Sequence, residues 1–83
     1  MLFDVIKVKY TQDYQLELEF ENGRKGTIDF NEYLKMGGMF NKLKNKSYFR
    51  KVYVNEDLGT ICWPGALDIA PETLYAKLKG KKK

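Results

Sequence analysis

Residues 14–30 read YQLELEFENGRKGTIDF, and this stretch decides the fold of the first half of the chain. Apolar side chains alternate with polar ones from residue 14 to residue 20, which is typical of an antiparallel strand buried on one face. The alternation resumes at residues 26–30, after the turn residues ENGR (21–24). Together with an earlier apolar segment at residues 3–10, this pattern predicts a three-stranded antiparallel meander.

The length of the second loop follows from which side chains must share a face. A two-residue loop at Asn22-Gly23 would put Ile28 and Leu16 on opposite faces of the sheet. A three-residue loop over 21–23 pairs Leu16 with Ile28 on the same face. We therefore predict the longer loop, with Gly23 left-handed in a G1 bulge, over the type I′ turn that Asn-Gly first suggests.

Short helices are expected in the middle of the chain. Asp29 is predicted to be the N-cap of a helix that ends at Gly37-Gly38, and residues 39–45 should add another helical turn or two. Ser47 is predicted to cap a turn that carries Tyr48 and Phe49. Two more strands are expected on either side of the turn NEDLG (55–59).

The end of the chain has the start and stop signals of a helix. Pro71 suits the first helical position, and lysines near the end favour the helix dipole, so we predict a helix from about Pro71 to Lys79. The fold class is therefore α+β, with a small antiparallel sheet of about five strands. We expect one domain over residues 1–80 and a frayed basic tail at 81–83.

The charges are arranged in blocks along the chain. The formal net charge is +4, yet residues 33–55 carry six basic and no acidic side chains, and residues 56–76 carry four acidic and no basic ones. A basic face and an acidic face are therefore both expected to be available to partners.

The composition argues against an enzyme. The chain has no His and a single Cys, Cys62, which apolar residues flank, so Cys-His catalysis and most zinc sites are excluded. Asp29 and Asp68 are the best candidate carboxylates, but each precedes a predicted helix, and we interpret both as structural. We predict no cofactor, no metal and no catalytic residue.

Localisation is expected to be cytoplasmic. One cysteine allows no internal disulfide, the first ten residues place Asp4 and Lys7 within the apolar stretch, unlike a signal peptide, and no apolar run approaches ~20 residues.

The stretch TICWPGALDIAPETLY (60–75) holds the only Cys and Trp of the chain and both of its prolines. We interpret it as a strand-to-helix corner, in which the Trp is a core anchor and Ile69 and Leu74 staple the start of the helix. The residues of this corner that we single out are Trp63, Pro64, Gly65, Asp68, Pro71, Leu74 and Tyr75.

The stretch KLKNKSYFRKVY (42–53) interleaves cations with aromatic residues, a pattern typical of nucleic-acid binding. The alternative is a solvated helical turn whose aromatic side chains belong to the core. The candidate binding residues are Lys42, Lys44, Lys46, Tyr48, Arg50 and Lys51.

The order of these features, and above all the closing signature Trp-Pro, Gly, Asp, Pro-Glu-x-Leu-Tyr, resembles a bacterial family of unknown function, DUF2442, over about residues 3–78. The resemblance implies a small α+β domain with a C-terminal helix and assigns no catalytic mechanism. It also implies a link to small two-gene pairs that resemble toxin–antitoxin modules.

Three hypotheses of function follow. The first is a non-enzymatic domain that binds another small protein in an antitoxin-like way. The second is a nucleic-acid-binding module that uses residues 42–53, and the third is an enzyme that uses Asp68 or Cys62. No membrane partner is expected, and self-association through a sheet edge is left open.

Overall fold

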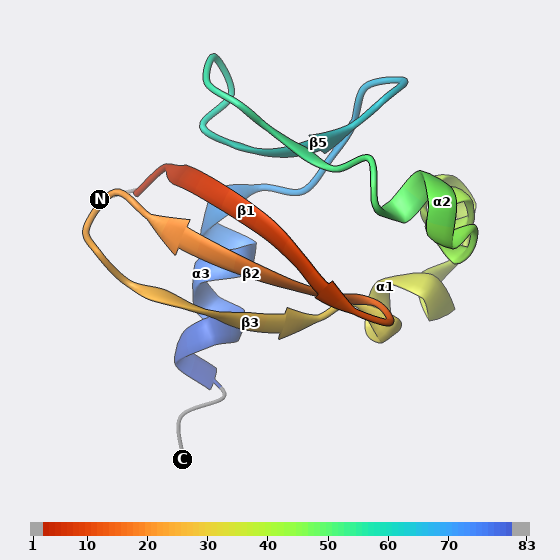
Figure 1. The fold of residues 1–83 in the computed structure, drawn as a ribbon, viewed down its shortest axis with the longest axis horizontal. Coiled ribbons are helices and arrows are strands. Elements are labelled where there is room, and N and C mark those ends of the chain that lie inside the picture. Colours follow the sequence, from red (N-terminus) through yellow and green to blue (C-terminus); the bar gives the residue numbers. More distant parts are fainter. Residues whose placement is uncertain (1–2, 81–83) are drawn as a thin grey trace.

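The structure, a computed structural model, describes residues 3–80. The first half is the predicted antiparallel meander of strands β1 (Val5–Gln12), β2 (Gln15–Phe20) and β3 (Lys25–Asp29), with β2 in the centre (Figure 1). The predicted tail at residues 81–83 lies outside the described residues.

The register of β2 and β3 confirms the parity argument. Leu16 pairs with Ile28 and Leu18 pairs with Gly26, so the apolar side chains share the inner face. The loop over residues 21–23 is closed by a hydrogen bond from the Gly23 N–H to the Phe20 carbonyl at 2.8 Å. Gly23 has φ +91°, the left-handed conformation that the three-residue loop requires.

Three short helical segments follow the meander: α1 (Asn31–Met36), the 3₁₀ helix η1 (Gly38–Lys44) and α2 (Lys46–Phe49). The N-cap of α1 is Phe30, so the prediction of Asp29 was wrong by one residue. The Asp29 carboxylate instead accepts a hydrogen bond from the Asn31 N–H at 2.9 Å, in a turn that precedes the helix.

The cap of α2 also differs from the prediction. Asn45, rather than Ser47, caps this helix, and its side chain accepts a hydrogen bond from the Tyr48 N–H at 3.2 Å. Asn and Ser both cap well, so local sequence did not separate two candidates two residues apart.

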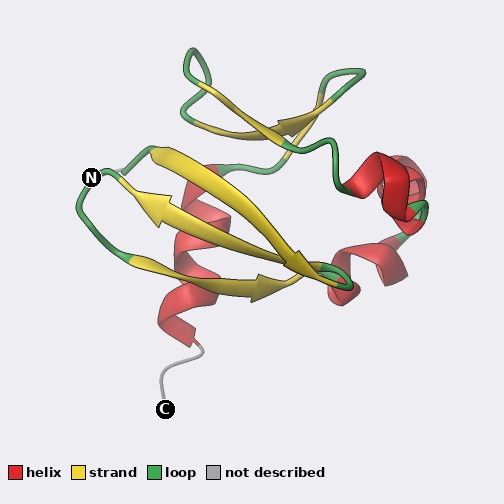
Figure 2. Cartoon of the chain, viewed as in Figure 1, coloured by secondary structure: helices red, strands yellow, loops and turns green. Residues whose placement is uncertain are grey.

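The prediction of about five strands in one sheet was wrong. Residues 3–80 form six strands in two three-stranded antiparallel sheets, and the second contains β4 (Tyr53–Asn55), β5 (Thr60–Trp63) and β6 (Leu67–Asp68) (Figure 2). Strand β6 exists because residues 65 and 66 both adopt positive φ and turn the chain back, so that Trp63 pairs with Leu67. Two residues are too few to show the period-two pattern of a strand.

The C-terminal helix α3 (Pro71–Gly80) begins at the predicted proline and extends one residue past the predicted end. It lies behind the meander in Figure 1 and packs on its inner face. Gly26 of β3 permits this close approach, since a Cβ there would lie 2.7 Å from Leu78 Cδ2. None of the described helices is long and apolar enough to cross a membrane.

The core lies between the meander, α3, the short helices and β5. An aromatic cluster of Phe30, Phe49 and Trp63 occupies its centre, with ring centroids 5.8–6.2 Å apart. The fully buried large side chains are Trp63, Phe20, Phe30, Phe49, Leu16, Leu18, Ile28, Leu43, Ile61, Leu74 and Val5.

Candidate functional site

The strand-to-helix corner at residues 60–75 supports the core. Trp63 is fully buried, and its Nε1–H donates to the Phe49 carbonyl at 2.8 Å, which satisfies an acceptor at the end of α2. Tyr75 packs edge-on against Phe20, and its hydroxyl accepts a hydrogen bond from Asn22 Nδ2 at 3.0 Å. These contacts fit the structural interpretation of the corner.

The two groups considered for catalysis lie on adjacent strands. Cys62 is 2% exposed, and burial, followed by the nearby Asp68 carboxylate, raises the pKa of its thiol. Asp68 is exposed and pairs with Cys62 across β5 and β6. Burial and the raised pKa both favour the neutral thiol over the nucleophilic thiolate.

Half of the basic stretch is occupied by contacts within the protein. Lys46 forms an ion pair with Asp13 at 3.6 Å, and Arg50 lies 5.0 Å above the ring of Tyr10. The Tyr48 hydroxyl donates to the carbonyl of Pro64. These contacts fasten the short helices to the meander and to the β5–β6 turn.

Two of the three aromatic side chains of this stretch pack inward. Phe49 is fully buried and Tyr48 is half-buried, whereas Tyr53 is exposed. Exposed cations remain at Lys42, Lys44 and Lys51. The structure therefore leaves cations at the surface but only one of the three rings exposed beside them.

A small hollow of about 270 Å³ lies between α1 and α3. Lys77 crosses it to form an ion pair with Glu32, and its ammonium lies 5.4 Å from the ring centroid of Tyr33. The Tyr33 hydroxyl is the one buried side-chain polar atom without a hydrogen-bond partner among the described residues, and burial raises its pKa. This hollow is narrow and is bridged by its own side chains.

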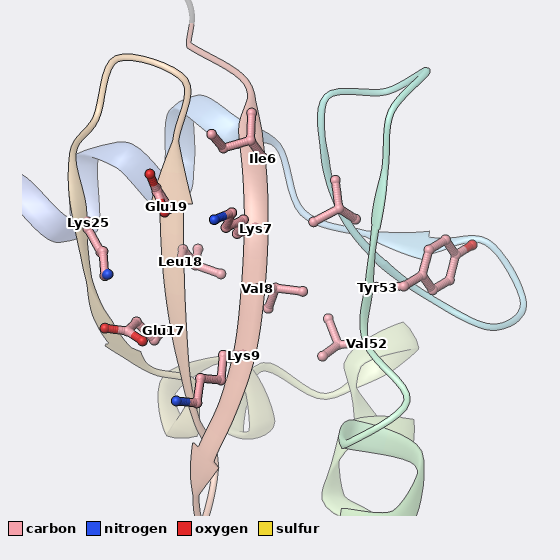
Figure 3. A pocket seen from close by; sticks show the side chains of 11 residues that line it. Ile6, Lys7, Val8, Lys9, Glu17, Leu18, Glu19, Lys25, Val52 and Tyr53 are labelled. Atoms are coloured by element: carbon pink, nitrogen blue, oxygen red, sulfur yellow. The ribbon is translucent and has the colours of Figure 1, made fainter.

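The larger hollow is a groove of about 600 Å³ beside β1 (Figure 3). Its floor is the outer face of the meander. Its wall is formed by Val52 and by Tyr53 and Val54 of β4. The residues that line the groove are Ile6, Lys7, Val8, Lys9, Glu17, Leu18, Glu19, Lys25, Val52, Tyr53 and Val54.

The floor of the groove has an ordered pattern of charge. Lys7 pairs with Glu19 and Lys9 pairs with Glu17 across β1 and β2, and Glu19 pairs with Lys25 of β3. The side chains of Lys7 and Lys9 extend from β1 toward β2, and Glu17 and Glu19 lie on β2, one strand further from the wall (Figure 3). In the described part of the chain, none of these five groups is within ion-pair distance of another.

The wall of the groove is apolar. Val52 and Val54 are half-buried, and Tyr53 is 44% exposed. Across the groove, Ile6 at the bulge of β1 is 46% exposed. Sequence reasoning missed this groove, because Val52, the first residue of the wall, lies 46 positions after Ile6, and the two segments meet only in the folded chain. The available signal was the Lys-x-Lys alternation of β1.

A family profile described as protein of unknown function (DUF2442) matches residues 5–80. The chain belongs to the DUF2442 family. The match begins at the first residue of β1 and ends at the last residue of α3, so the DUF2442 region includes both sheets and the whole groove.

No match was found among curated proteins or among solved structures. The family match confirms the resemblance seen in the sequence, and the structure confirms the predicted α+β class.

Proposed function

We propose that this DUF2442 domain is a non-enzymatic interaction domain that holds a segment of another small protein in the groove between β1 and β4. One observation carries the proposal. Of the five large apolar side chains that are exposed in the described part of the chain, two, Ile6 and Tyr53, line this one groove beside three lysines. Apolar side chains gathered in a polar rim are typical of protein-binding surfaces.

The energetics of this surface suit a partner. Exposed apolar area gains roughly 25 cal/mol per Å² when a partner removes it from water. Tyr53 is an aromatic side chain with a polar end, and aromatic anchors of this kind carry much of the binding free energy of interfaces. An antitoxin-like role, with a small protein as the neutralised partner, is part of this proposal.

A photo-crosslinking experiment tests the proposal. A photoreactive phenylalanine analogue is placed at Tyr53 in one variant and at Thr73, an exposed position on α3, in a control. We expect a discrete small protein to crosslink from position 53 and not from position 73, in the native cell. The proposal fails if no discrete protein is captured from position 53, or if both positions capture the same set.

The partner captured in this way is then purified and tested for direct binding. Ile6→Ser should weaken the affinity for the purified partner, because it removes apolar surface from the groove. Leu58→Ser is the matched control, since Leu58 is also exposed but does not line the groove. Equal loss in both variants contradicts a role of this groove.

Nucleic-acid binding through residues 42–53 is the second candidate. The exposed cations Lys42, Lys44 and Lys51 favour it, because residues 33–55 contain no acidic side chain. Binding of this kind would rest mainly on phosphate contacts, since Phe49 is buried and the Tyr48 hydroxyl is bonded to the Pro64 carbonyl, which leaves Tyr53 as the exposed ring of this stretch. A salt-dependent gel shift that Lys42→Ala and Lys44→Ala weaken supports it, and no shift at low salt removes it.

A further inference from the structure

We infer that the groove takes an extended segment of the partner in which apolar side chains alternate with carboxylates. This inference rests on the proposed function and specifies the chemistry of the partner. It is carried by the charges of β1 and by the apolar wall beside them.

The lysines of β1 set the spacing of the partner's charges. Lys7 and Lys9 lie on the same face of the strand, because side chains alternate and these two are two residues apart. A strand rises about 3.3 Å per residue, so the two side chains leave the strand roughly 6.6 Å apart. An extended segment lying alongside β1 repeats its own side chains at that spacing, so carboxylates at alternate positions match both lysines.

The glutamates of β2 limit where an acidic side chain can sit. Glu17 and Glu19 lie one strand further from the wall and would repel carboxylates placed over them. The partner's acids are therefore confined to the line of β1, next to the wall. Charge selects both the partner and its place in the groove.

The wall accepts the other half of the alternation. Val52, Tyr53 and Val54 line the groove on the side of β4, and Ile6 lines it from β1. An extended segment directs alternate side chains to opposite sides. If its carboxylates face the lysines of β1, the residues between them face this apolar wall.

The edge of β1 is occupied by the second sheet. The Val5 N–H donates to the Gly59 carbonyl at 2.9 Å, and Val8, Val52 and Val54 pack against the core beside it. The segment is therefore inferred to lie over the face of β1 rather than to pair with its edge.

A second copy of this chain does not fit the same place. Antiparallel pairing of β1 with β1 of another copy, centred at Val8, would set Lys7 opposite Lys9 in both directions. Like charges directly opposite destabilise a strand pair, and lysines on an edge strand are a known guard against such pairing. The strand of this chain in which acidic residues alternate is β2, and it already pairs with β1 and β3.

The test uses fluorescence anisotropy with two labelled, end-capped octapeptides. In one, Glu alternates with Val, and in the other, Lys alternates with Val. We expect saturable binding of the Glu peptide that weakens as salt rises, and at least tenfold weaker binding of the Lys peptide. Equal binding of both peptides, or no binding of the Glu peptide at low salt, overturns the inference.

Reversing the charges of Lys7 and Lys9 distinguishes binding in the groove from attraction to the overall net charge of the protein. The double variant K7E/K9E should lower the affinity for the Glu peptide at least tenfold and raise the affinity for the Lys peptide. K35E/K44E makes the same change of net charge at exposed sites outside the groove and should leave binding within twofold. The inference is overturned if the control loses as much affinity as K7E/K9E, with thermal unfolding showing both variants folded.

The remaining outcomes are also decisive. Sedimentation of the wild-type chain should show a monomer, and a dimer that K7E/K9E dissociates would overturn the choice of a foreign segment. If a protein crosslinks from position 53 but the Glu peptide does not bind, only this inference fails. If nothing crosslinks from position 53, the proposed function fails with it.

Discussion

Replacement of Trp63 by Phe tests the link between the second sheet and the short helices. The Trp63 Nε1–H is the donor to the Phe49 carbonyl, and both residues are 0% exposed. A buried acceptor left without a donor costs about 1–3 kcal/mol. The smaller ring also leaves a void of roughly 40 Å³, worth about 1 kcal/mol at ~24 cal/mol per Å³. We expect Trp63→Phe to lower the free energy of unfolding by about 3 kcal/mol.

Urea denaturation measures this loss. Far-UV circular dichroism is the appropriate signal, because Trp63 is the only tryptophan of the chain and its fluorescence disappears with the substitution. With an m-value of about 1–1.5 kcal/mol/M, typical of a small domain, the unfolding midpoint should fall by at least about 2 M. Tyr53→Phe at the exposed wall of the groove is the control, and it should stay within about 0.5 kcal/mol of wild type.

A tryptophan isostere divides the loss into its two parts. Benzothienylalanine keeps the size of the indole and replaces its N–H with sulfur, so it removes the hydrogen bond and leaves no void. We expect it to cost about 1–3 kcal/mol, most of the effect of Trp63→Phe. A loss below about 1 kcal/mol in Trp63→Phe would refute the argument that this contact joins the second sheet to the core.

Three further predictions concern stability and reactivity. The hydrogen bond and charge of Lys77 hold the pKa of Glu32 below its ordinary value of 4.5, so this pair stabilises the fold above that pH. The stability advantage of wild type over Glu32→Gln should disappear as pH falls below 4.5, and urea titrations that show a constant difference would contradict this. Gly59→Ala should destabilise the fold more than Gly23→Ala. Both glycines have positive φ, but only at Gly59 does the new Cβ meet a neighbour, the Asp4 carboxylate at 2.3 Å, which must then move. Backbone strain alone predicts about 1 kcal/mol for Gly23→Ala, and equal melting temperatures for the two variants would count against the clash. Cys62 should react with a thiol reagent only after unfolding, since it is 2% exposed and its thiol pKa is raised, and fast labelling of the native protein would disprove this.

Local patterns predicted much of the fold. The parity of Leu16 and Ile28 gave the correct loop and register, and Pro71 marked the correct start of α3. Both features depend on residues no more than 12 positions apart, so one short window of sequence contains the whole cause. Caps were less certain, as Phe30 shows, because several neighbouring residues can satisfy the same backbone groups.

The sequence by itself determined the family, the α+β class and the strand-to-helix corner, because these depend on local alternation, turn residues and a signature of rare residues. Tertiary structure alone decided that the strands divide into two sheets, and that the aromatic rings of residues 48 and 49 turn inward. It also decided the groove, which joins β1 to residues 52–54. The physical reason is that alternation fixes the face on which a side chain lies, whereas packing of distant segments decides which faces and edges meet.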